Sequence, residues 1–174
     1  MLLSRRTLIA AALLPGGGAR AQTLNEARVK ARVALTLARF TQWPTAAFAS
    51  TSDPLLLCVA HRSDTLFSAF EELGGQTVAG RPVKIVASAP TSGACHALFV
   101  HESAERDGAA ALAAWAAQPV LTIGDGDGFA ARGGMVELAN VNDATRLDVN
   151  LKALRAARLE LSSQVLKLAR QVRE

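Results

Sequence analysis

The order of strand-like and helix-like segments constrains the fold of this chain more than any other feature of its sequence. Four short apolar runs have the length and composition of buried strands. They lie at residues 54–60, 82–87, 97–100 and 119–123. Helical patterns lie at about 64–73, where Asp64 could cap the first turn, and at about 105–117. Strands that alternate with helices predict a parallel sheet covered on its faces by helices.

The last third of the chain predicts a β-hairpin and two helices. The strands are expected at 135–139 and 146–150, and the helices at about 151–157 and 162–173. Asn142-Asp143 between the strands is a turn sequence, and Ser162 or Ser163 could cap the last helix. We therefore expect a single α/β domain over residues 22–174, with a mixed, mostly parallel sheet, flanking helices and a C-terminal hairpin plus helices.

The first 21 residues have the pattern of a secretory signal peptide. Arg5-Arg6 precede a short apolar core at 8–14, and Ala19-Arg20-Ala21 resembles a cleavage site. The core is too short to span a membrane, so we expect no direct membrane insertion. Arg5-Arg6 also suggest twin-arginine export, which leaves the export route open.

The charge of the mature chain argues against nucleic acid as a partner. Cleavage after Ala21 removes three arginines and no acid, so the net charge of +4 falls to +1. The remaining basic residues are not interleaved with aromatic residues. This balance excludes the strongly basic surface that nucleic-acid-binding proteins use.

Cys58 and Cys95 are the only two cysteines. In an exported chain an even number of cysteines favours a disulfide. A metal site is the alternative, because His61 and His96 follow the two cysteines closely. On a strand, Cys58 and His61 would lie on opposite faces about 10 Å apart, which is too far for one tetrahedral ion. We expect no metal, and nothing in the sequence indicates a cofactor.

Polar residues follow three predicted strands and form a candidate ligand crevice. His61, His101 and Asp125 each stand at a strand end, and we add Arg132 from the next loop. Ligands of open α/β sheets bind outside the carboxyl ends of parallel strands. Such residues are also common at any solvated sheet edge. The sequence has no nucleophile-elbow or phosphate-loop pattern, so we assign no catalytic residue and do not expect an enzyme.

An N-terminal helix is predicted over residues 25–40, and it should end before Pro44. Arg28, Arg32 and Arg39 form a stripe along it, which could dock an acidic partner or simply face water. Trp43 at its exit could be a partner anchor or a core residue. The basic C-terminal segment could bind an acidic partner or could merely offset the dipoles at helix C-termini.

Several short motifs along the chain form a recognisable set. They lie at residues 29–31, 38–44, 55–59, 95–100, 119–125, 128–130, 133–135, 149–151 and 161–163. Together they resemble the YfiR family of small periplasmic proteins. The resemblance covers residues 26–173. Each motif alone is common, but their order and spacing are specific.

The resemblance implies a periplasmic regulator that is not an enzyme. Relatives repress an inner-membrane diguanylate cyclase by binding its periplasmic sensor portion, which lowers cyclic-di-GMP signalling and so bears on biofilm formation. The resemblance also implies a redox-sensitive homodimer, with the family disulfide at Cys58 and Cys95.

On this basis we assign the partner-binding surface to the end of the first helix and to the C-terminal helices. Its residues are Arg39, Phe40, Trp43, Arg155 and Arg158. Many relatives carry aromatic residues in the first helix, where this chain has Val33, Leu35 and Leu37. This chain therefore cannot make a contact that depends on those rings. The other function that the sequence supports is capture of a small ligand in the crevice.

Overall fold

The computed structural model describes residues 17–87, 94–142 and 144–174 and has the expected α/β architecture. The helices are α1 (Gly17–Arg39), α2 (Asp64–Glu71), α3 (Glu105–Trp115), α4 (Leu151–Ala156) and α5 (Ser163–Leu168), with short 3-10 turns at Thr45–Ala47 and Glu102–Ala104. The first strands are β1 (Thr41–Gln42), β2 (Leu55–Ala60), β3 (Thr77–Val78), β4 (Arg81–Ala87) and β5 (Ala97–Val100). The others are β6 (Leu121–Gly124), β7 (Val136–Val141), β8 (Ala144–Asn150), β9 (Glu160–Leu161) and β10 (Ala169–Arg173).

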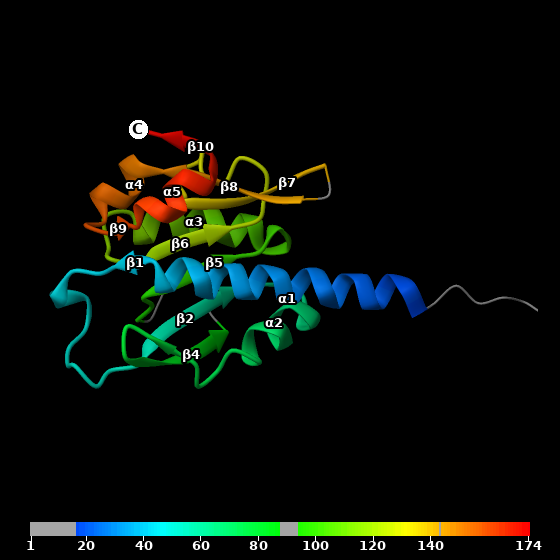
Figure 1. Ribbon diagram of the computed structural model, residues 1–174, viewed down its shortest axis with the longest axis horizontal. Coiled ribbons are helices and arrows are strands. Elements are labelled where there is room, and N and C mark those ends of the chain that lie inside the picture. Colours follow the sequence, from blue (N-terminus) through cyan, green and yellow to red (C-terminus); the bar gives the residue numbers. More distant parts are fainter. Residues whose placement is uncertain (1–16, 88–93, 143) are drawn as a thin grey trace, which may run out of the picture.

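An eight-stranded sheet forms the middle of the domain, in the order β10-β8-β7-β6-β5-β2-β4-β3 (Figure 1). The central strands β4, β2, β5, β6 and β7 run parallel to one another. Strand β8 returns antiparallel to β7, as the hairpin pattern predicted. β2, β5 and β6 are therefore the parallel neighbours that a shared strand-end crevice requires.

One face of the sheet carries the larger core. Helix α1 lies across this face beside α2, and α4 and α5 cover the part nearer β8 (Figure 1). Along α1, small and apolar residues such as Ala31, Ala34 and Leu37 are buried at helical spacing. Phe70 of α2 packs on Phe99 of β5, with ring centroids 4.9 Å apart. Burial on both faces explains why β5 is continuously apolar.

The opposite face carries a smaller core under α3 and the loop that follows β6. It contains Cys58, Leu98 and Phe129, with Leu112 and Trp115 of α3 packed against them. Because side chains alternate along a strand, Leu57 enters the larger core and Cys58 the smaller one.

The predicted helix over 162–173 is wrong in its second half. Helix α5 is capped by Ser162, as expected, but it ends at Leu168, and residues 169–173 form β10 parallel to β8. An ion pair between Arg170 and buried Asp148 holds this strand to β8. The spacing of Leu161, Val165 and Leu168 resembles a helix, but strand pairing and this ion pair override it.

Two helix starts also differ from the prediction. Ser63, not Asp64, is the N-cap of α2, and its hydroxyl accepts a hydrogen bond from the Leu66 amide. Helix α1 begins at Gly17 rather than at residue 25, so it includes residues 17–21 of the expected signal peptide. The rest of that peptide lies outside the described residues, and the signal peptide stays a prediction. Among the helices described, none has the length and apolar character needed to cross a membrane.

Candidate functional sites and family

The disulfide expected between Cys58 and Cys95 is present. The parallel pairing of β2 with β5 sets Cys58 beside the residues that enter β5, and the two Cα atoms lie 5.9 Å apart. Both side chains are buried. Within the ranges that the structure describes, no three His, Cys, Asp or Glu side chains gather where they could hold a metal ion.

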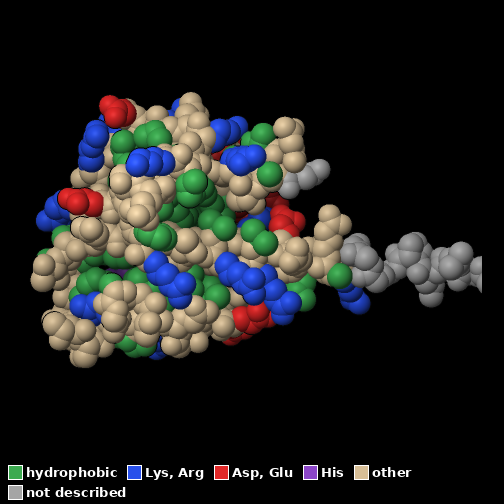
Figure 2. Space-filling view, in the orientation of Figure 1, with side chains coloured by type: hydrophobic (Ala, Val, Ile, Leu, Met, Phe, Trp, Pro, Cys, Tyr) green, Lys and Arg blue, Asp and Glu red, His purple; other side chains and the backbone are tan. Residues whose placement is uncertain are grey.

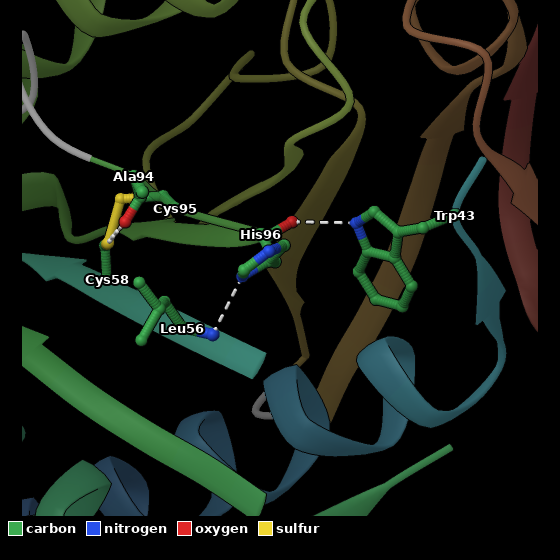
Figure 3. The surroundings of a disulfide bond; sticks show 6 residues. All are labelled: Trp43, Leu56, Cys58, Ala94, Cys95 and His96. Atoms are coloured by element: carbon green, nitrogen blue, oxygen red, sulfur yellow. Dashed lines mark hydrogen bonds between the residues drawn. A yellow bond between two sulfur atoms is a disulfide. The ribbon is translucent and has the colours of Figure 1, made fainter. Parts of the chain in front are cut away.

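His96 lies next to the disulfide, and its ring contacts two backbone groups, of which Figure 3 draws the Leu56 amide. Its Nδ1 accepts a hydrogen bond from the Leu56 amide at 3.0 Å, and its Nε2 lies 3.1 Å from the Ala47 carbonyl. An Nδ1 that accepts leaves the proton of a neutral ring on Nε2, where it can be donated to Ala47. Burial lowers the pKa of His96, and the hydrogen bond to Ala47 only partly offsets this effect. The neutral ring is therefore the native form.

Trp43 is tied into the same region. Its indole Nε1 donates to the His96 carbonyl at 3.0 Å, and the side chain packs against the larger core (Figure 3). Phe48 stacks on His96 with ring centroids 4.2 Å apart, and the Arg81 guanidinium lies 3.8 Å from the Phe48 centroid. Trp43 thus has a structural role, and its part in a partner contact stays a prediction.

The other expected partner-binding residues lie around a short two-stranded ladder. Strand β1 pairs antiparallel with β9, and the Ser162 amide donates to the Phe40 carbonyl at 2.9 Å. This ladder brings the end of α1, with Arg39 and Phe40, beside the segment that carries Arg155 and Arg158. We call these four residues the ladder surface. The three arginines are exposed, and the Phe40 side chain remains 39% exposed.

The same face of the molecule is basic and apolar. Figure 2 shows Lys and Arg side chains along α1, and hydrophobic side chains between α1 and the C-terminal segment. Arg28 pairs with Glu72 at 2.8 Å, and Arg39 donates to Gln76 at 2.8 Å. Part of the arginine stripe therefore fastens α1 to its neighbours.

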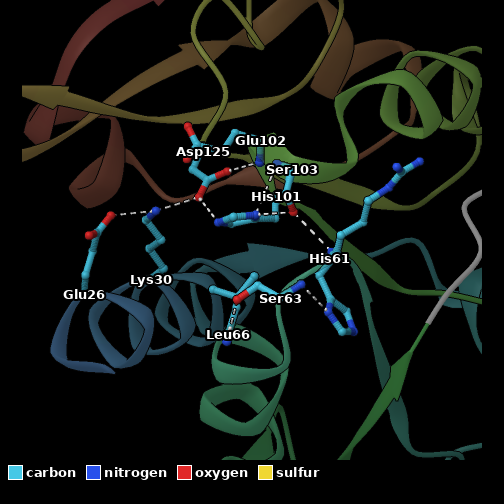
Figure 4. Close-up of polar contacts among 10 residues, drawn as sticks. Glu26, Lys30, His61, Ser63, Leu66, His101, Glu102, Ser103 and Asp125 are labelled. Carbon is cyan, nitrogen blue, oxygen red and sulfur yellow. Dashed lines mark hydrogen bonds and ion pairs between the residues drawn. The ribbon is translucent and has the colours of Figure 1, made fainter. Parts of the chain in front are cut away.

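At the carboxyl end of β6, Asp125 is the centre of a buried polar network (Figure 4). Its side chain is only 1% exposed, and Oδ2 lies 2.8 Å from Nζ of Lys30 on α1. Oδ1 accepts from the Glu102 amide at 2.7 Å, and His101 Nε2 lies 3.6 Å from Oδ2. The structure therefore brings together His101 and Asp125 of the predicted crevice.

Lys30 is the residue of this network that the sequence did not reveal. Burial lowers its pKa, but its contacts with Asp125 and Glu26 outweigh that effect, and the net pKa is raised. Lys30 is therefore charged at neutral pH and neutralises the buried carboxylate of Asp125. The ion pair fixes α1 to the carboxyl end of the sheet.

His61 is not part of this network. Its ring stacks on Phe67, with centroids 4.8 Å apart, and its Nδ1 accepts from the Ser63 amide at 3.2 Å. Figure 4 shows the His61 ring directed away from His101 and Asp125. A catalytic group that needs all three side chains in mutual hydrogen-bond reach is therefore not formed.

The hollow around the crevice is divided. A small cavity of about 80 Å³ is lined by His101 and Arg132. A larger groove of about 760 Å³ runs between α1 and the β7–β8 hairpin, and Lys30 and Asp125 lie in its wall. Arg132 thus lines the same small cavity as His101, but it is not among the residues that line the larger groove.

The loop after β6 is held by a buried carboxylate that was not expected from the sequence. Glu137 of β7 accepts hydrogen bonds from the Gly128 amide at 3.1 Å and the Ala130 amide at 3.0 Å. Phe129 lies between two glycines, and a Cβ on Gly124 or Gly134 would approach its ring to 2.4 or 2.2 Å. An acidic residue in an otherwise apolar strand was the available sequence signal.

Comparison with known proteins agrees with the motif resemblance. The profile of the YfiR/HmsC-like family matches residues 27–170. The match runs from the buried face of α1 to the start of β10, and so includes the disulfide, the buried ion pair and the ladder surface. No curated protein matches the chain significantly. The chain belongs to the YfiR/HmsC-like family.

Proposed function

We propose that this protein is a periplasmic regulator that binds the periplasmic portion of an inner-membrane diguanylate cyclase and lowers its activity. Family membership supports the class of function. The observation that supports the proposal for this chain is the β1–β9 pairing, which sets the segment with Arg39 and Phe40 beside the segment that carries Arg155 and Arg158. Export to the periplasm and dimerisation are parts of the proposal that the signal-peptide pattern and the resemblance support.

The composition of the ladder surface favours a protein partner. Aromatic residues and arginine dominate the binding energy of protein interfaces, and the ladder surface offers an exposed Phe40 and three exposed arginines. The positive charge favours an acidic patch on the partner. Preferential binding to the inactive conformation of the cyclase would shift its conformational equilibrium toward that state.

The disulfide would make the proposed repression depend on redox conditions. Because Cys58 and Cys95 are buried, a reductant reaches them mainly when the domain opens locally. Once reduced, the protein loses the stabilisation that the cross-link supplies. Reductive stress in the envelope would then lower the amount of folded repressor and release the cyclase.

Capture from solubilised inner membrane tests the proposal. We expect the oxidised, tagged protein to recover a membrane protein with a cyclase domain, identified by mass spectrometry. Phe40→Ala and the double variant Arg155→Glu/Arg158→Glu should each reduce recovery at least about tenfold. Arg146→Glu changes an exposed arginine of β8 outside the ladder surface and should recover the same protein as the wild type.

Each variant is first shown by circular dichroism and thermal melting to be folded. Equal recovery with all folded variants would place the partner contact elsewhere. Absence of any cyclase from the wild-type eluate would contradict the proposed function itself.

A second candidate function is the capture of a small ligand in the groove beside α1. Its volume of about 760 Å³ is within the range of small-molecule sites, and its lining includes the carboxylates of Glu26, Glu102 and Asp127. An organic cation fits this lining best. We expect spermidine, but not glutamate, to raise the melting temperature, and Asp127→Asn to weaken that effect. An unchanged melting temperature at millimolar spermidine would remove this candidate.

A further inference from the structure

A second hollow lies at the opposite end of the sheet from the Asp125 network. This cavity has a volume of about 360 Å³ and is bounded by α3, α4 and the loop before β7. Thr122 of β6 and Met135 are buried residues of its lining. Leu112 and Trp115 of α3, each partly buried, contribute the largest apolar side chains.

Small side chains border part of the cavity. Ala131 in the loop and Ala153 and Ala156 on α4 reach it only with methyl groups. Ala131 and Ala156 are exposed, so the cavity is open to solvent on that side. Its volume is within the range of small-molecule sites.

The neutral polar groups around the cavity already have partners inside the protein. Thr122 Oγ1 accepts a hydrogen bond from the Met135 amide at 3.0 Å. Asn150 Oδ1 accepts from the Ala153 amide at 3.0 Å and so caps α4. Lys152 remains as the charged group of the lining, and no ion pair of its ammonium group is found among the described residues.

We infer that this cavity binds a small carboxylate with an aromatic or aliphatic body. The apolar body would lie against Trp115 and Met135, and the carboxylate would meet Lys152 at the rim. An apolar lining with a single cation distinguishes ligands by charge as well as by shape. The ammonium group forms an ion pair with an anionic ligand, whereas it contributes much less binding energy to a neutral one. No residue of the ladder surface lines this cavity, so this inference does not depend on the proposed function.

Tryptophan fluorescence offers a direct test. The chain has two tryptophans, and Trp115 lines the cavity whereas Trp43 packs beside His96. We expect phenylacetate to change the emission of the oxidised protein saturably. Phenylacetamide has the same shape without the charge and should bind at least about fivefold more weakly.

Two variants and two matched controls locate the site. Lys152→Gln should weaken phenylacetate binding about five- to tenfold and leave the weak binding of phenylacetamide unchanged, whereas Lys167→Gln on α5 should have no effect. Ala156→Leu should abolish binding by filling the cavity. Ala114→Leu makes the same change on an exposed face of α3 that does not line the cavity, and it should bind as the wild type does.

Two kinds of result would overturn the inference. The first is the absence of a saturable signal with the folded wild-type protein. The second is equal affinity for phenylacetate and phenylacetamide, or full binding by folded Ala156→Leu. A normal pull-down of a cyclase together with either result would leave the proposed function intact and remove only this site.

Discussion

The two ends of the central sheet are held by different chemistry. At the amino end of β5, a disulfide joins Cys95 to Cys58 and a neutral His96 is fixed by backbone hydrogen bonds. At the carboxyl end of β6, Lys30 of α1 neutralises the buried carboxylate of Asp125. The carboxyl end is where α/β proteins usually bind ligands, but here the protein's own lysine already pairs its buried charge. The position of a site in a fold therefore has to be checked against what the chain itself places there.

The largest effect on stability is expected at the amino end of the sheet, which the disulfide holds. Replacing both cysteines, Cys58→Ala/Cys95→Ala, removes a cross-link between residues 37 apart and should lower the free energy of unfolding by about 4 kcal/mol. Urea unfolding of the oxidised wild type and the variant measures the difference. A loss below about 1 kcal/mol would mean that the disulfide contributes little to the fold, and the redox part of the proposed function would fail.

Removing one partner of the Lys30–Asp125 ion pair, at the carboxyl end of the sheet, should lower the free energy of unfolding almost as much. Lys30→Met leaves the Asp125 carboxylate buried without its cation, and we expect a loss of about 3 kcal/mol in urea unfolding. The double variant Lys30→Met/Asp125→Asn removes the charge as well and should regain much of that stability. If the double variant is as unstable as the single one, lost packing rather than unpaired charge explains the effect.

The stability of the protein in mild acid should distinguish the two ends of the sheet, because His96 lies at the amino end. Its pKa is lowered in the folded state, mainly by burial, so the unfolded chain takes up a proton at higher pH than the folded one. The stability due to the neutral ring is complete above the ordinary histidine pKa of about 6.5 and is lost as the pH falls toward the folded pKa. We therefore expect the free energy of unfolding to decrease in mild acid, because protonation of His96 favours the unfolded chain.

The measurement is urea unfolding at about pH 7.5 and about pH 5. His96→Asn keeps an acceptor for the Leu56 amide but cannot titrate, so its stability should change less between the two conditions than that of the wild type. His61→Asn removes a different histidine and serves as the control. Equal pH dependence of the wild type and His96→Asn would rule out His96 as the source of the effect.

The smallest expected difference in stability is the one between two variants that each lack a helix cap. Ser63→Ala after β2 and Asn150→Ala before α4 each remove a side chain that caps a helix, with a cost of about 1 kcal/mol. Asn150 also donates to the Ala130 carbonyl at 3.0 Å, so its replacement should cost about 0.5–1.5 kcal/mol more. Thermal melting of both variants checks the order, and an equal loss would show that the bond to Ala130 contributes nothing measurable.

The features that could be predicted from the sequence are those that depend on local composition. The buried strands are short apolar runs, the two hairpin strands flank the sequence Asn142-Asp143, and two cysteines allow only one pairing. Asp125 and His101 were found because the ends of parallel neighbouring strands meet at one edge of a sheet.

The features that were missed depend on contacts between distant segments. Lys30 resembles any other charged residue of an amphipathic helix until α1 lies over the end of β6. Residues 169–173 continue a helical pattern, but pairing with β8 and the contact between Arg170 and Asp148 make them a strand. The cavity at Trp115 is bordered by the small side chains of Ala131, Ala153 and Ala156 on separate elements, which no single motif records.

The pairing of β1 with β9 also has a consequence for the order in which the chain folds. Thr41 and Leu161 are register partners, so the segment that fastens the end of α1 lies far from this helix in the sequence and is synthesised long after it. Contacts between residues so far apart in the sequence require closure of a long loop and slow the folding reaction. Until this loop closes, the C-terminal segment does not pack against the buried face of α1. A nascent chain that is cut short before residue 160 would therefore present an apolar helix to chaperones and proteases.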